Sequence, residues 1–112
     1  MEHKLLASSD AKDFLKFFLK IPAEQWTIKA FSHNDCSCAA GHLGVTSSSI
    51  QLSDSASRMT DLLVKFRRKV RGDELIHLTI TGVNDGDNLK YQQRTPRDRI
   101  IALCNDMILA GL

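Results

Sequence analysis

Residues 95–110, TPRDRIIALCNDMILA, predict a long helix and do most to decide the fold class. Thr95 can cap the first turn, and Pro96 suits the first helical position because its missing N–H would have no partner there. Asp98 follows the cap by three residues, as in a capping box. We expect the helix to span residues 96–110. Its apolar positions recur at helical spacing and form one core-facing stripe of Ile100, Leu103, Cys104, Met107 and Ile108.

Two other stretches predict long helices. The first covers residues 10–20, where Ser9 or Asp10 can cap it and a proline beyond its last residue ends it. The second covers residues 54–71, and Gly72 is placed to stop it. The apolar stripe of this second helix consists of Met59, Leu62, Leu63, Phe66 and Val70.

The segment between the first two long helices predicts smaller elements. Trp26 is expected to pack on the core, and residues 27–31 alternate weakly enough for a short strand. Residues 32–35 then form a loop or a helix cap. Small side chains over residues 36–43 favour a short, closely packed helix, with Gly44 as its left-handed terminator.

Residues 75–83 are rich in β-branched side chains, which favours a strand, although a short helix or an irregular buried segment remains an alternative. Residues 84–88 read Asn-Asp-Gly-Asp-Asn, a turn signal. If residues 91–93 are extended, a β-hairpin closes around this turn.

These elements predict a mainly α fold, with α+β as the alternative. We expect one compact globular domain over residues 1–112, built from three principal helices, a short cysteine-containing helix and room for one small β-hairpin. The chain has 112 residues, of which 43% are apolar and 25% charged, an ordinary globular composition. A domain of this size can fold without a disulfide or a structural metal.

The composition also bears on location. The sequence has no run near the ~20 apolar residues of a membrane span and no apolar core of a signal peptide. Three cysteines are an odd number, so we interpret them as reduced and expect a cytoplasmic protein without membrane contact.

Two of the three cysteines and two of the four histidines lie within ten residues. His33, Cys36, Cys38 and His42 offer four soft ligands for tetrahedral zinc. The Cys-x-Cys spacing is tighter than usual, and a helix beginning at Cys36 would direct the two thiols differently. We therefore expect no cofactor, with cysteines that pack in the core, and keep zinc as an alternative.

A cysteine nucleophile is the second chemical hypothesis. Cys38 near a helix N-terminus would have a lowered pKa, and His42, four residues later, could act as its base. His77 is another candidate base, and Asn84 or Asp85 could orient the imidazole. No local signature of a known thiol protease accompanies these residues, so packing explains Cys38 equally well.

Basic residues and an acidic turn are the remaining candidates. The net charge is only +2, but residues 65–71 concentrate cations, among them Arg67 and Arg68. A solvated helix end explains them better than nucleic-acid binding does. The turn at 84–88 lacks the final glutamate of a calcium loop, and we expect its chief role to be turn formation. A second structural role is a hydrogen-bond hub in which Asp85 could pair with Arg97 or Arg99.

The order of several landmarks resembles a group of small bacterial and phage proteins of unknown function. The landmarks are Trp26, the stretch Cys36-Ser-Cys-Ala-Ala-Gly-His-Leu-Gly44, Val83-Asn-Asp-Gly86 and Tyr91-Gln-Gln-Arg-Thr-Pro-Arg-Asp-Arg-Ile100. The resemblance implies a largely helical fold in which the cysteine helix lies near Asn84 and Asp85. It implies no activity.

Together these observations favour a small, non-enzymatic interaction or regulatory domain with a protein partner. Its candidate surface comprises residues 33–44 and the turn at Asn84 and Asp85. The alternative is a thiol- or zinc-dependent enzyme centred on Cys38, His42 and Asp85. A third hypothesis is weak nucleic-acid binding through Arg67 and Arg68, and the oligomeric state stays open.

Overall fold

The computed structural model describes residues 8–28, 32–33, 36–44 and 54–112. Within these ranges the chain is mainly α, as predicted. The helices are α1 (Ala11–Leu19), α2 (Ala39–His42), α3 (Asp54–Arg67), α4 (Ile80–Asn84) and α5 (Pro96–Leu109), joined by two 3₁₀ turns, Ala23–Gln25 and Gly72–Leu75, and by two strands, β1 (Ser32–His33) and β2 (Cys36–Ser37).

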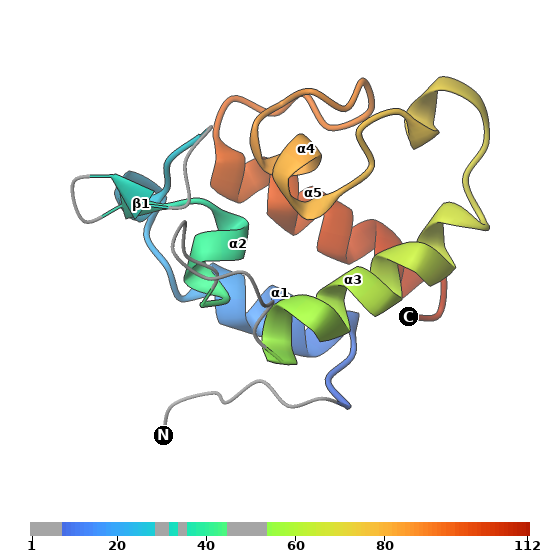
Figure 1. Ribbon diagram of the computed structural model, residues 1–112, viewed down its shortest axis with the longest axis horizontal. Coiled ribbons are helices and arrows are strands. Elements are labelled where there is room, and N and C mark those ends of the chain that lie inside the picture. Colours follow the sequence, from blue (N-terminus) through green and yellow to red (C-terminus); the bar gives the residue numbers. More distant parts are fainter. Residues whose placement is uncertain (1–7, 29–31, 34–35, 45–53) are drawn as a thin grey trace.

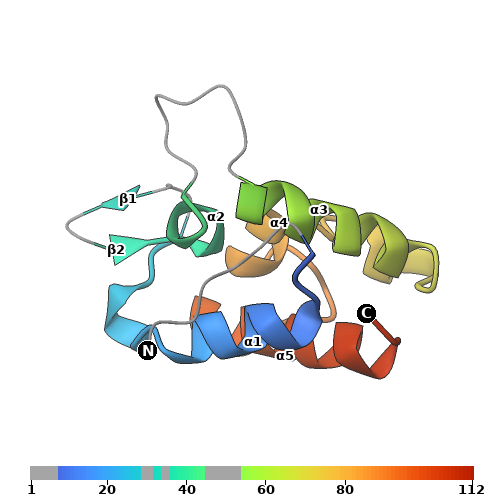
Figure 2. The ribbon, with the colours of Figure 1, turned by 90° about the horizontal axis from the view of Figure 1, so that it is seen from below.

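The helices form two layers around one core (Figures 1 and 2). Helices α1 and α5 pack side by side as one layer, and Figure 2 shows α2, α3 and α4 on the other side. The short strands lie beyond α2, at one end of the molecule. Helix α5 packs against α1, α4 and α2, so the element predicted first from the sequence is also the one most central to the fold.

Helix α5 confirms its sequence signal. The Thr95 side chain accepts a hydrogen bond from the main-chain N–H of Asp98 at 3.1 Å, and Pro96 occupies the first helical position. Four of the five predicted stripe residues are fully buried, and Ile108 is half-buried. Because the cap satisfies a free N–H and the stripe meets the core, local and tertiary preferences agree.

Helix α1 is capped by Asp10 in a reciprocal capping box with Asp13. Trp26 then packs on the core, as predicted, and lies 5.5 Å from Phe18 between ring centroids. Helix α3 begins at Asp54 as expected but ends before the predicted residue 71. After α3 the chain continues in tighter turns, in which hydrogen bonds join residues three positions apart. Gly72 then adopts a left-handed φ of 69°.

The prediction of a β-hairpin around residues 84–88 is wrong. Within 75–83 the chain instead makes a turn and the short helix α4. Thr79 caps this helix, because its hydroxyl accepts a hydrogen bond of 2.9 Å from the Gly82 N–H, which has no partner within the helix. His77 adopts a left-handed φ of 57°, and a Cβ on Gly82 would collide with the His77 main-chain oxygen. This close approach, together with the threonine cap, outweighs the β-propensity of the segment.

The hairpin lies elsewhere: β1 falls in the segment expected to be a loop or a cap, and β2 falls at the start of the short helix expected over residues 36–43. Strands β1 and β2 pair antiparallel, with Ser32 opposite Ser37 and His33 opposite Cys36. Trp26, which precedes the strand predicted over 27–31, forms a bridge with Ser37, and residues 29–31 of that predicted strand lie outside the described residues. In the described part of the chain, every helix is too short or too polar to cross a lipid bilayer.

Candidate functional site

Cys38 lies just before α2 rather than within it, which corrects the predicted helix over residues 36–43. It is the N-cap, and its Sγ accepts a hydrogen bond from the Gly41 N–H at 3.5 Å. Only 2% of its surface is exposed. Burial raises the pKa of the Cys38 thiol, and the nearby Asp85 carboxylate adds to this effect, while amide hydrogen bonds oppose it. The thiol therefore stays neutral, and a neutral thiol is a poor nucleophile.

His42 closes α2 and is held by neighbours outside it. Its Nε2 lies 3.0 Å from the main-chain oxygen of Gln25, to which it donates, and the Trp26 ring packs edge-on at 4.9 Å between centroids. Burial lowers the pKa of His42, although hydrogen bonds to the main chain at Gln25 and Ser37 partly offset the effect. The imidazole is thus a neutral packing group that links α2 to the turn after α1.

The predicted zinc ligands are only partly covered by the structure. The main chains of His33 and Cys36 pair in the hairpin, but their side chains lie outside the described residues. Across the side chains that the structure does describe, no group of three or more histidines, cysteines and acids is arranged to hold a metal ion. Zinc binding by His33, Cys36, Cys38 and His42 stays an untested alternative to the expected domain without a cofactor.

Asn84 is the hub that the sequence assigned to its neighbour. It is completely buried. Its Oδ1 accepts a hydrogen bond from the Ala39 N–H at 2.9 Å, and its Nδ2 donates to the Thr27 main-chain oxygen at 3.0 Å and to Asp85 Oδ1 at 2.9 Å. The side chain therefore ties together α2, α4 and the segment after Trp26, and every one of its hydrogen-bonding atoms is used.

Arg99 completes this hub from α5. Its Nε and Nη2 both donate to the Asn84 main-chain oxygen, at 3.1 and 2.7 Å, and its Nη1 donates to the Gln93 oxygen at 2.7 Å. The fork satisfies the last carbonyl of α4 in a buried place. Arg97 instead donates to main-chain oxygens at the end of α1, so the hydrogen bonds described for both arginines go to main-chain oxygens rather than to the predicted partner, Asp85.

The resemblance implied that the cysteine helix and the Asn84–Asp85 turn are close, and the Asn84–Ala39 hydrogen bond confirms this proximity. The same bond corrects the role of the region. Asn84 is buried, so it cannot be a contact surface for a partner, whereas Asp85 is half-buried. Among the described side chains of this region, Cys38, His42 and Asn84 therefore serve the assembly of the fold.

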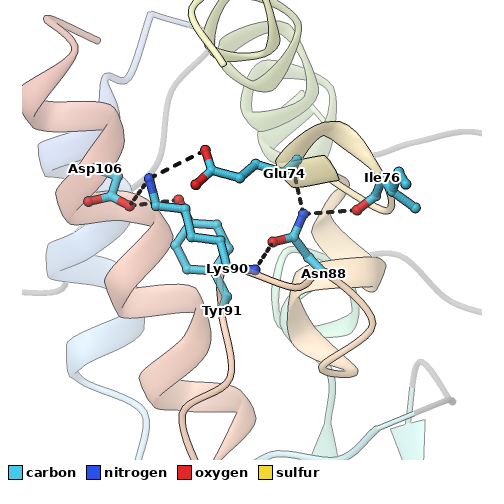
Figure 3. A network of polar contacts seen from close by, with 6 residues as sticks. All are labelled: Glu74, Ile76, Asn88, Lys90, Tyr91 and Asp106. Atoms are coloured by element: carbon cyan, nitrogen blue, oxygen red, sulfur yellow. Dashed lines mark hydrogen bonds and ion pairs between the residues drawn. The ribbon is translucent and has the colours of Figure 1, made fainter. Parts of the chain in front are cut away.

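A second polar network holds the segment after α3 (Figure 3). The buried Asn88 donates from Nδ2 to the main-chain oxygens of Glu74 and Ile76, at 2.8 and 2.9 Å, and accepts from the Lys90 N–H at 2.9 Å. Figure 3 shows the Lys90 ammonium between Glu74 and Asp106. These contacts fix the course of residues 74–76.

That fixed segment forms one wall of an open groove, whose other wall is α3. The groove has a volume of about 820 Å³. Val64 from α3 and Ile76 from the facing segment line it with 47% and 54% of their surface exposed. Aliphatic residues dominate the remaining lining, among them Leu63, Leu75 and Ile80. The groove is thus an apolar, accessible cavity of the size that small ligands occupy.

Arg67 marks one end of this groove. Its Nη1 donates to the main-chain oxygens of Leu75 and Leu78, at 3.0 and 3.2 Å, and so joins the two walls. Its neighbour Arg68 is exposed and does not line the groove. Of these two arginines, Arg67 lines the groove and Arg68 does not.

Sequence reasoning missed the groove itself. The apolar stripe of α3 explains its buried face, and Val64 falls beside that stripe rather than on it. An aliphatic residue outside the core stripe was the available signal. The exposure of Ile76 on the opposite wall was not predicted, because its segment was expected to be a strand.

Comparison of the chain with known protein families, with curated proteins and with solved structures gives no match. This result is consistent with the resemblance noted above to small proteins of unknown function.

Proposed function

We propose that the protein is a non-enzymatic binding domain whose ligand occupies the groove between α3 and residues 75–81. The observation that carries the proposal is the pair of half-exposed aliphatic side chains, Val64 and Ile76, in one apolar cavity of about 820 Å³. Exposing such side chains to water is unfavourable, and clustered exposure in a concave site is typical of binding surfaces. The groove replaces residues 33–44 and Asn84 as the candidate contact region.

The surroundings of the cysteines support a binding role over a catalytic one. A nucleophile needs an accessible thiolate, whereas Cys38 is buried and burial raises its pKa. The candidate base, His42, uses its Nε2 to donate to the Gln25 oxygen. The proposal also places the protein in the cytoplasm, because the free thiols of Cys38 and Cys104 suit a reducing compartment.

Nucleic-acid binding is less well supported. Phosphate binding requires several cations on one surface. Arg67 spends two of its N–H groups on main-chain oxygens and borders an apolar groove, which a phosphate backbone would not fill. A protein or small-molecule ligand with an apolar part fits the observed lining better.

The proposal is tested with Nile red, an uncharged apolar dye that fluoresces when it leaves water. The native protein should enhance its fluorescence, and Val64→Gln or Ile76→Gln should remove most of the effect. Leu109→Gln is the matched control, because Leu109 is 85% exposed on α5 and does not line the groove. Equal fluorescence with all variants, or none with the native protein, would exclude the groove as the binding site.

A further inference from the structure

The groove has a direction set by α3. Ala56, Thr60, Leu63, Val64 and Arg67 line it from one end of the helix to the other. At about 1.5 Å per residue, the eleven steps from Ala56 to Arg67 correspond to roughly 16 Å. The groove is therefore elongated, a shape that suits an extended chain.

The groove is apolar along most of this length. Ala40 and Ala56 lie at the end away from Arg67, and Leu63 and Val64 follow along the helix. The Thr60 hydroxyl donates to the Ala56 main-chain oxygen at 2.9 Å, so its hydrogen is already bonded within α3. A ligand lying here gains from burial of hydrocarbon and finds few groups for directed hydrogen bonds.

At the other end of the groove, the Arg67 guanidinium provides a positive charge and hydrogen-bond donors that are not all used. Arg67 uses its Nη1 hydrogens for the Leu75 and Leu78 oxygens, which leaves Nε and Nη2 without a partner among the described residues. The lining includes His77 as well, and no aspartate or glutamate. A guanidinium with free N–H groups at the end of an apolar cavity is complementary to an anionic group.

The size of the groove favours a small ligand over a protein partner. Cavities for small ligands span about 300–1,000 Å³, a range that includes the value of 820 Å³ found here. A stable protein interface uses roughly 20–30 residues on each side. Only 13 of the described residues line the groove. The observations therefore favour a small amphiphile.

We infer that the groove binds an aliphatic chain with an anionic head group, with the chain along α3 and the head group at Arg67. This inference rests on the proposed function, since it names the ligand class for the same groove. The shared chemistry is an alkyl chain with an anionic head group, which occurs both in a free carboxylate and in an anionic lipid of a membrane.

Three probes with the same ten-carbon alkyl chain test the charge preference: undecanoate and decyltrimethylammonium, which carry opposite charges on it, and the neutral 1-decanol. Decanoate, shorter by one methylene, is titrated beside them, and each probe is kept below its micelle-forming concentration and followed by displacement of Nile red. We expect undecanoate to bind about tenfold more tightly than 1-decanol, as one charge-assisted hydrogen bond would give. Decyltrimethylammonium should bind most weakly, because its cation meets Arg67.

Arg67→Gln should remove the advantage of undecanoate and leave 1-decanol binding unchanged. The neutral probe thereby reports whether the groove survives the loss of the hydrogen bonds to Leu75 and Leu78. Arg68→Gln is the matched control, with the same charge change on an exposed neighbour outside the lining. It should leave all three affinities unchanged.

The outcomes separate this inference from the proposed function. Equal binding of undecanoate and 1-decanol, or an equal effect of Arg67→Gln and Arg68→Gln, overturns the anionic ligand while the groove stands as a binding site. Absence of binding by all three probes and by Nile red overturns both. Sedimentation with phosphatidylglycerol vesicles distinguishes the sources: decanoate binding without sedimentation supports a free carboxylate, and sedimentation without decanoate binding overturns the inference.

Discussion

The Oδ1 atom of the completely buried Asn84 accepts a hydrogen bond of 2.9 Å from the main-chain N–H of Ala39, 45 residues earlier in the chain. This one contact satisfies a free N–H at the start of α2 from a side chain at the end of α4. A four-residue helix cannot persist on its own, so it depends on such tertiary partners.

Replacement of Asn84 by alanine should therefore lower the free energy of unfolding by about 3 kcal/mol, because it removes the buried partner of the Ala39 N–H and a part-buried donor to the Thr27 oxygen. Urea denaturation followed by tryptophan fluorescence measures the change. Asn105→Ala, at an exposed position on α5, is the matched control and should alter stability by less than about 0.5 kcal/mol. Similar losses in both variants would show that Asn84 is not a structural hub.

The environment of Tyr91 leads us to expect that the free energy of unfolding depends on pH in the alkaline range. It is the sole tyrosine, and its hydroxyl donates to Asp106 Oδ2 at 2.8 Å (Figure 3). Burial and the Asp106 carboxylate raise the pKa of Tyr91 far above its ordinary value. The unfolded chain loses this proton near pH 10, whereas the folded protein keeps it, so stability should fall as the pH rises above about 10.

Tyr91→Phe should cost about 1 kcal/mol at neutral pH, because one hydrogen bond is lost, and should weaken the alkaline decline. Urea unfolding followed through Trp26 at a series of pH values measures both effects. Ionisation of Tyr91 in the folded protein near pH 10, detected by its ultraviolet absorbance, would contradict the buried hydrogen bond.

The buried thiols predict slow chemistry. Burial raises the pKa of Cys104 to about 12 and also raises that of Cys38. In a Cys36→Ser background both should react slowly with a maleimide at neutral pH and quickly in denaturant, since the reactive thiolate is scarce in the folded state. Mass spectrometry of timed samples gives the rates. Rapid modification of native Cys38 would favour the thiol enzyme over the binding domain.

The parts of the fold that were predicted correctly depend on short-range signals. Thr95, Pro96 and Asp98 define the start of α5 within four residues, and Asp10 does the same for α1. Helical spacing of apolar residues identified the buried face of α3. Such features depend on neighbours within one or two turns, so a single sequence contains the information.

The features that sequence reasoning missed depend on distant partners. Asn84 binds Ala39 and Thr27, which lie 45 and 57 residues away, and nothing in its local sequence separates it from Asp85 as the centre of a hub. Residues 75–83 have strand-like composition, but the left-handed His77 and its contact with Gly82 allow a helix to start there. The groove then arises because this segment meets α3, a pairing with no short-range signal.

A titration of isotope-labelled protein with decanoate, followed by the backbone amide resonances, locates the ligand on the protein and so tests whether the groove is the binding site. We expect saturable shifts along α3 between Ala56 and Arg67 and in residues 75–81, with little change in α1, and loss of these shifts in Val64→Gln but not in Leu109→Gln. Shifts confined to the region of Cys38 and His42 would contradict the assignment of the groove as the binding site, and the absence of any saturable change would contradict the anionic ligand inferred for it.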